Sequence, residues 1–145
     1  MYLTGEEVYK KFNDEAMEIK IQKKLLLDLM KQVSRHNDIL NDEKDMTNNF
    51  AIREIINSTE MLMTKLFILM AEPYDKKEVI LSLTIAEFLV LRDIVFCNYT
   101  MLHLKTKINS QLLKVYKEFY KQIENIYEEL NSNEIEAYWD FIKNS

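Results

Sequence analysis

The chain has 145 residues, the usual length of a single domain. It contains one glycine and one proline, where average usage predicts about ten and about seven. Turn-rich all-β folds and glycine-rich phosphate-binding loops are therefore excluded. The net charge of −5 is too weak to indicate a nucleic-acid-binding protein from charge alone. We expect a single helical domain over residues 1–145.

The first predicted helix begins at a capping box, in which Thr4 and Glu7 each satisfy a backbone N–H group of the helix start. Apolar residues then recur at alternating steps of three and four, which is typical of one buried helix face. The pattern fades after residue 34 and stops in the polar run 41–45. We expect one helix from about residue 5 to 34–40. Its seam consists of Tyr9, Phe12, Ala16, Ile19, Lys23, Leu26, Met30 and Val33.

The second predicted helix begins near Asn48 or Asn49, because asparagine is a good N-cap residue. It must end before Pro73, since proline disfavours helical backbone in the residue that precedes it. A short turn over residues 73–75 follows. Asp75 and Glu78 then have the spacing of a second capping box.

The third predicted helix, about residues 76–105, is apolar on most sides. One apolar stripe is uninterrupted, and a second stripe lies on another side of the helix. The alternation over residues 81–85 also fits a strand, but the capping box and the length of the apolar pattern favour a helix. Charged residues at its middle disfavour a membrane span. The second stripe contains Leu81, Phe88, Leu91, Val95, Tyr99 and Leu102.

A fourth helix is predicted after Asn109 and Ser110, and a cap-rich break at residues 131–133 separates it from a short last helix over about 134–143. The connections are short, so neighbouring helices are expected to be antiparallel. The predicted fold is thus an all-α antiparallel bundle of four long helices plus a short C-terminal helix.

The sequence offers no arrangement typical of catalysis, of a metal site or of a cofactor site. Neither His36 nor His103 has a carboxylate three residues before it, as a di-metal helical bundle requires. Cys97 lies on an apolar stripe, where a thiol is usually inert. We therefore expect a protein that is not an enzyme, with no catalytic residues, no metal and no cofactor.

Arg92, Asp93 and His103 form the one polar set on which a hydrolase or nuclease would depend. Arg92 resembles the arginine of the helical HEPN ribonucleases, in which a histidine follows four to six residues later. Asn98 occupies the sixth position here. The resemblance implies a HEPN-like relative that lacks the usual histidine, and this reading is one alternative to a non-enzymatic protein.

Lysines gather at the start of the fourth helix and glutamates at its end, which opposes the helix dipole. Pairing with an antiparallel neighbour is the simplest explanation. A basic rim for a protein partner and a nucleic-acid-binding patch are the two alternatives. The lysines are Lys105, Lys107, Lys114, Lys117 and Lys121.

The function expected from these observations is protein–protein binding by an adaptor, an inhibitor or an immunity-type regulator. The compositional bias indicates an AT-rich genome, such as that of a phage, a virus or a mobile element. We expect an intracellular protein with no membrane association, because the first 15 residues lack the pattern of a signal peptide.

Self-association is also expected, because the apolar stripes exceed what a monomer of five helices buries. We predict a homodimer. The second stripe of the third helix and the last helix are the two candidate contact surfaces. Their residues are Phe88, Leu91, Val95, Tyr99, Tyr138, Trp139 and Phe141.

Overall fold

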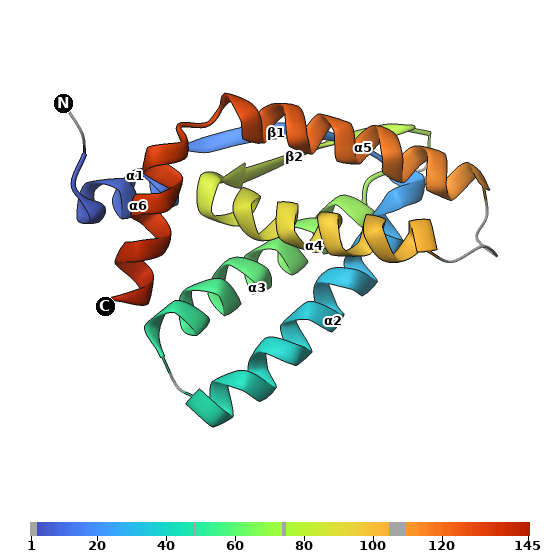
Figure 1. Cartoon of the computed structure of the whole chain (residues 1–145). Helices are drawn as coiled ribbons and strands as arrows, with labels where there is room; N and C mark the ends of the chain where they lie inside the picture. The colour runs from blue at the N-terminus through green and yellow to red at the C-terminus, as the bar shows by residue number, and fades with distance from the viewer. Residues whose placement is uncertain (1–2, 48, 74, 105–109) are drawn as a thin grey trace.

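The structure is a computed structural model that describes residues 3–47, 49–73, 75–104 and 110–145. In this part of the chain, helices predominate and two strands form a small antiparallel sheet (Figure 1). The elements are α1 (Gly5–Asp14), β1 (Ala16–Gln22), α2 (Lys23–Thr47), α3 (Phe50–Met70), β2 (Glu78–Thr84), α4 (Ile85–Leu104), α5 (Ser110–Glu129) and α6 (Ser132–Lys143).

The prediction of a mostly helical protein is confirmed, but two of the predicted helices each contain a strand. The helix expected over residues 5 to 34–40 is divided into α1, β1 and α2, and the helix expected over 76–105 is divided into β2 and α4. The predicted antiparallel bundle of four long helices and a short one is therefore not confirmed. The remaining expected boundaries, those of α3, α5 and α6, agree with the structure to within two residues.

The sheet forms because apolar residues recur with a period of two in both strands and give one apolar face, whereas the other face is mostly polar, with Ile80 as an exception. Ile19 lies opposite Leu81, and Ile21 lies opposite Val79, with all four side chains buried on the inner face. On the outer face, Lys20 lies opposite Ile80, and both are exposed. One residue of slippage would exchange these two faces, so the apolar alternation fixes the register.

Helix α5 runs beside the sheet and protects one of its edges (Figure 1). The side-chain amide of Gln122 donates to the backbone carbonyl of Lys20 at 2.8 Å, and its oxygen accepts from the Lys20 N–H group at 3.0 Å. These two bonds occupy the backbone groups that β1 turns away from β2. An exposed strand edge pairs readily with other chains, and Gln122 removes part of that hazard.

Strand β2 continues directly into α4 through a capping box. The Thr84 N–H group donates to Glu87 Oε1 at 2.8 Å, and the Glu87 N–H group donates to Thr84 Oγ1 at 3.1 Å. The predicted box of Asp75 and Glu78 is wrong, because Glu78 begins a strand. The box predicted from Thr4 and Glu7 is confirmed at the start of α1.

Helix α4 occupies the centre of the molecule, between the α2–α3 pair on one side and α5 with the sheet on the other (Figure 1). Every residue from 85 to 91 is buried, including the charged Glu87. Glu87 Oε1 accepts a hydrogen bond from Lys65 Nζ of α3 at 2.6 Å. A buried carboxylate requires such partners, because its transfer out of water is otherwise unfavourable.

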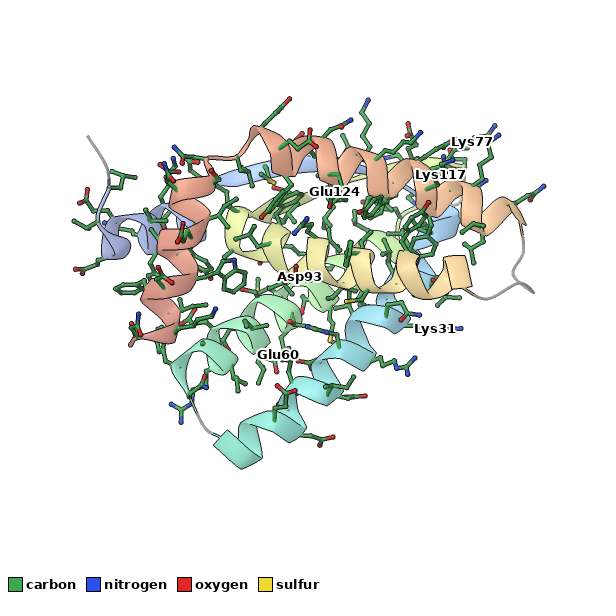
Figure 2. All side chains as sticks on the ribbon, viewed as in Figure 1. Lys31, Glu60, Lys77, Asp93, Lys117 and Glu124 are labelled. Atoms are coloured by element: carbon green, nitrogen blue, oxygen red, sulfur yellow. The ribbon has the colours of Figure 1, made fainter. Side chains whose placement is uncertain are left out.

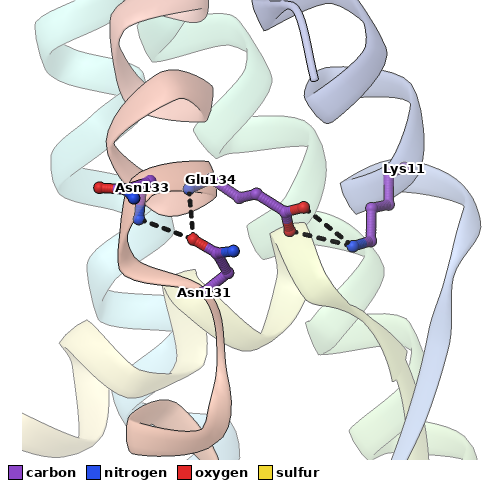
Figure 3. A network of polar contacts seen from close by, with 4 residues as sticks. All are labelled: Lys11, Asn131, Asn133 and Glu134. Atoms are coloured by element: carbon purple, nitrogen blue, oxygen red, sulfur yellow. Dashed lines mark hydrogen bonds and ion pairs between the residues drawn. The ribbon is translucent and has the colours of Figure 1, made fainter. Parts of the chain in front are cut away.

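Helices α1 and α6 pack against each other at the other end of the molecule. Asn131 caps α6, as the polar break predicted, and its Oδ1 accepts from the N–H groups of Asn133 and Glu134 (Figure 3). Glu134 also pairs with Lys11 Nζ of α1 at 2.9 Å. The cap and the ion pair together fix where α6 begins relative to α1.

The central position of α4 leads to a first prediction. Val95 is fully buried, so Val95→Asp places a carboxylate in the core and is expected to unfold the chain. Ile68→Asp is the matched control, because Ile68 is 60% exposed and the same change there leaves the stability within about 1 kcal/mol of wild type. Circular dichroism against temperature measures both. A folded Val95→Asp variant of wild-type stability would contradict the placement of α4.

The two capping boxes lead to a second prediction. Glu87→Ala removes the acceptor for both Thr84 and Lys65 and is expected to lower the free energy of unfolding by about 1.5–3 kcal/mol, the range for hydrogen bonds to charged groups. Glu7→Ala is the control, because the Thr4 box is exposed and its loss costs about 1 kcal/mol or less. Urea denaturation compares the two. An equal loss of unfolding free energy in the two variants would show that the burial of Glu87 does not strengthen its hydrogen bonds.

Candidate functional site

The third-helix residues expected at a partner contact are core residues. Phe88, Leu91 and Val95 are all fully buried within the chain, where they belong to one apolar cluster with the inner face of the sheet. Tyr99 is partly buried and stacks on Tyr120 of α5, with ring centroids 4.8 Å apart. The burial of Phe88, Leu91 and Val95 corrects the expectation that this stripe is exposed, because α4 is enclosed by α1, α2, α3, α5 and β2.

The aromatic residues of α6 also pack within the chain. Tyr138 is buried and lies 5.1 Å from Phe12 between ring centroids. Phe141 lies 5.2 Å from Tyr9, and Trp139 meets Tyr138 edge to face at 5.3 Å. Trp139 and Phe141 are partly exposed. This cluster joins α6 to α1 and leaves little of its aromatic surface for a partner.

The lysines predicted as a basic rim are only partly described. Lys114, Lys117 and Lys121 are exposed on α5, where their spacing of three and four residues puts them on one helix face. Lys105 and Lys107 lie outside the described residues. Glu118 is also exposed on this part of α5, so the face is less basic than the run of lysines indicates.

Arg92, the residue on which the ribonuclease alternative depends, is engaged by α5. Its Nε donates to Glu124 Oε1 at 2.9 Å, and its guanidinium carbon lies 3.8 Å from the centre of the Tyr127 ring. These contacts raise the pKa of Arg92, with the hydrogen bond to Glu124 as the main cause. Arg92 thus ties α4 to α5 in the described structure.

Asp93, by contrast, lies within electrostatic range of His36 of α2, a neighbour that the sequence did not indicate. Burial lowers the pKa of His36, although the charges of Asp93 and Glu43 act in the opposite direction. Loss of solvent raises the pKa of Asp93, and Arg92 and His36 oppose that rise. The side chain of His103 is outside the described part. Within that part, no group of three or more histidine, cysteine or acidic side chains is placed to hold a metal ion.

A buried hydroxyl joins α5 to α2. The Tyr116 side chain is fully buried, and its hydroxyl donates to a carboxylate oxygen of Asp28. Burial, together with this hydrogen bond, raises the pKa of Tyr116 well above 10. The phenol therefore remains protonated and serves as a fixed donor in the core.

A cavity of about 670 Å³ opens where α2 begins, α3 ends and β2 begins. It was missed by sequence reasoning, although the pairs Lys23–Lys24 and Lys76–Lys77 are visible in the sequence. Strand pairing brings these pairs together, since Gln22 lies opposite Glu78 and the Lys23 N–H group donates to the Lys77 carbonyl at 2.8 Å. The lining residues are Gln22, Lys23, Lys24, Leu26, Leu27, Met70, Lys76 and Lys77.

Exposed apolar side chains gather on the α2–α3 pair. Five of the eight large hydrophobic side chains exposed in the described part of the chain belong to these two helices. On α3 they share the solvent-facing side of the helix. The five are Leu27 and Ile39 of α2, and Met61, Phe67 and Ile68 of α3.

The lowered pKa of His36 leads to a third prediction. The folded state binds the His36 proton less tightly than the unfolded chain, whose histidine has a pKa of about 6.5. The neutral form of His36 therefore contributes fully to the free energy of unfolding above pH 6.5. This contribution is lost as the pH falls from 6.5 towards the lower pKa that His36 has in the folded state. Urea denaturation between pH 7.5 and pH 5 is expected to show a smaller loss in His36→Gln than in wild type. Equal losses would contradict the burial of His36.

No helix in the described residues is both long and apolar enough to cross a membrane. Comparisons with protein families, with curated proteins and with solved structures find no match to this chain.

Proposed function

We propose that the chain is a non-enzymatic helical protein that binds another protein, with the exposed side of α3 as its contact surface. The observation that carries this proposal is the concentration of exposed apolar side chains on α3. Met61, Phe67 and Ile68 are 49%, 67% and 60% exposed. Single exposed hydrophobic residues are ordinary, but several on one helix face mark an interaction surface.

The α3 surface has the form of a helical stripe with little charge. Its exposed positions recur at steps of three and four residues, so they lie on one side of the helix. Glu60 is the only charged residue among those from Asn57 to Ala71 that are exposed on this side. The stripe contains Asn57, Glu60, Met61, Thr64, Phe67, Ile68 and Ala71.

This composition favours a partner that presents an apolar face of its own, such as an amphipathic helix laid along α3. Removal of the Phe67 and Ile68 side chains from water would supply the driving force for binding. The polar residues of the stripe are suited to the solvent-exposed rim of the interface. An adaptor, an inhibitor or an immunity-type regulator would each use a surface of this kind.

A second copy of the chain is the other occupant to consider, because a homodimer is also expected from the sequence. With Phe88, Leu91 and Val95 in the core, the α3 stripe replaces the third-helix stripe as the candidate dimer contact. Two copies of α3 related by a two-fold axis would bury the same residues on both sides. Light scattering distinguishes this case by a mass twice the 17.4 kDa of one chain.

The fourth prediction tests the proposal with a paired substitution, Phe67→Asp with Ile68→Asp, in a capture experiment from the native host. Proteins retained by wild type are expected to be reduced about tenfold by the variant, because both charges would be buried in the contact. Lys117→Asp with Lys121→Asp on α5 is the control and is expected to capture normally. Melting curves establish that both variants are folded.

Two results would contradict the proposal. One is equal capture by wild type and the α3 variant. The other is capture of nucleic acid that falls steeply with salt and is lost in the α5 variant, which would favour the alternative based on the lysines of the fourth helix.

A further inference from the structure

We infer that the cavity between the start of α2 and the end of α3 binds a small amphiphile with an anionic head group, such as an alkyl carboxylate or an alkyl phosphate. The inference goes beyond the proposed binding of a protein and does not depend on it. Its basis is the combination of lysines at the rim with an apolar floor in one cavity of about 670 Å³. Small-molecule sites usually have volumes of about 300–1,000 Å³.

The four lysines of the cavity contribute in different ways. Lys23 Nζ donates to the backbone carbonyls of Glu72 and, at 2.6 Å, Pro73, so it joins the start of α2 to the segment that follows α3. Lys76 Nζ lies 3.7 Å from Glu72 Oε2, a long contact between two partly exposed side chains. Such a pair is weak and exchanges readily for a stronger anionic partner.

Lys24 and Lys77 are exposed, and neither forms an ion pair with the part of the chain that the structure describes. Lys77 projects at the end of the molecule where the two strands meet α2 (Figure 2). No acidic side chain is among the described residues that line the cavity. The positive charges of Lys24 and Lys77 are therefore suited to bind an anion, and Lys76 lies in the same cavity lining.

The floor of the cavity explains why the ligand should also have an apolar part. Leu26, Leu27 and Met70 line it. Leu27 is 53% exposed, although its neighbours Leu25, Leu26 and Leu29 are buried. A hydrocarbon chain laid against Leu27 and Met70 would remove this surface from water, at about 25 cal/mol per Å² of apolar area.

The two features together define the ligand class. Inorganic phosphate alone would use the lysines and leave the floor exposed, whereas a neutral lipid would use the floor and leave the lysines without a counter-charge. A single chain of about ten carbons with one anionic group satisfies both and fits within the volume given for small-molecule sites.

The fifth prediction is tested by calorimetric titration of the full chain, at amphiphile concentrations below micelle formation. Decanoate and decyl phosphate are expected to bind with one molecule per chain. Three controls each lack either the anionic group or the alkyl chain and are expected to bind at least about tenfold more weakly. They are decanol, decyltrimethylammonium and inorganic phosphate.

Variants locate the site. Lys24→Ala with Lys77→Ala is expected to weaken decanoate binding about tenfold, and Leu27→Ser is expected to weaken it by a similar factor through loss of apolar contact. Lys10→Ala with Lys143→Ala removes the same charge from exposed positions on α1 and α6, at the other end of the molecule, and is expected to leave binding unchanged. Circular dichroism confirms that each variant retains its helix content.

Several outcomes would overturn the inference. These are no binding of decanoate or decyl phosphate at about 1 mM, affinity for decanol equal to that for decanoate, or weakening by the control on α1 and α6 equal to that by the cavity variants. Binding to vesicles of anionic lipid without binding of the dissolved amphiphiles would also overturn it, because the occupant would then be a membrane surface.

Discussion

The pairing of β1 with β2 is the constraint on which the rest of the structure depends. It joins two segments separated by the whole of α2 and α3, and its inner face belongs to the same apolar core as the buried residues of α4. Because each strand passes directly into a helix, the register of the sheet also sets where α2 and α4 begin. The cavity at the start of α2 and the buried Glu87 at the start of α4 both follow from that register.

Three polar or charged groups in the interior of the described structure are each met by a second element. Glu87 has Lys65 of α3 and the backbone of Thr84, Arg92 has Glu124 and Tyr127 of α5, and the Tyr116 hydroxyl has Asp28 of α2. Each contact links α4 or α5 to a neighbour, so polar contacts specify which helices are adjacent while the apolar core supplies most of the stability.

The helical elements with one buried face were predictable from sequence, because local spacing and caps define them. Thr4, Asn49 and Asn131 cap helices as expected. Strand β1 was not predictable, because Ile19 and Ile21 fit a helical seam and a strand equally well until their partners Leu81 and Val79 are known. Strand β2 did have a signal in the alternation over residues 81–85, but the helix interpretation was preferred there. The box of Thr84 with Glu87 was a local signal for the true start of α4, and the spacing of Asp75 with Glu78 obscured it.

The candidate site was less predictable than the fold. Phe88 and Leu91 were assigned to a contact surface because an uninterrupted third helix left nothing to cover them, whereas the elements packed around α4 bury both. Lys24 and Lys77 come together only through the register of strands far apart in sequence. Local periodicity contains no information about such a juxtaposition.

The insertion of α2 and α3 between the paired strands has a consequence for folding kinetics. The two helices form from contacts local in sequence, but β1 and β2 meet only after the chain between them has closed into a long loop. Helix formation takes microseconds or less, whereas non-local pairing is slow. Refolding of this largely helical chain is therefore expected to be limited by its smallest element, the two-stranded sheet.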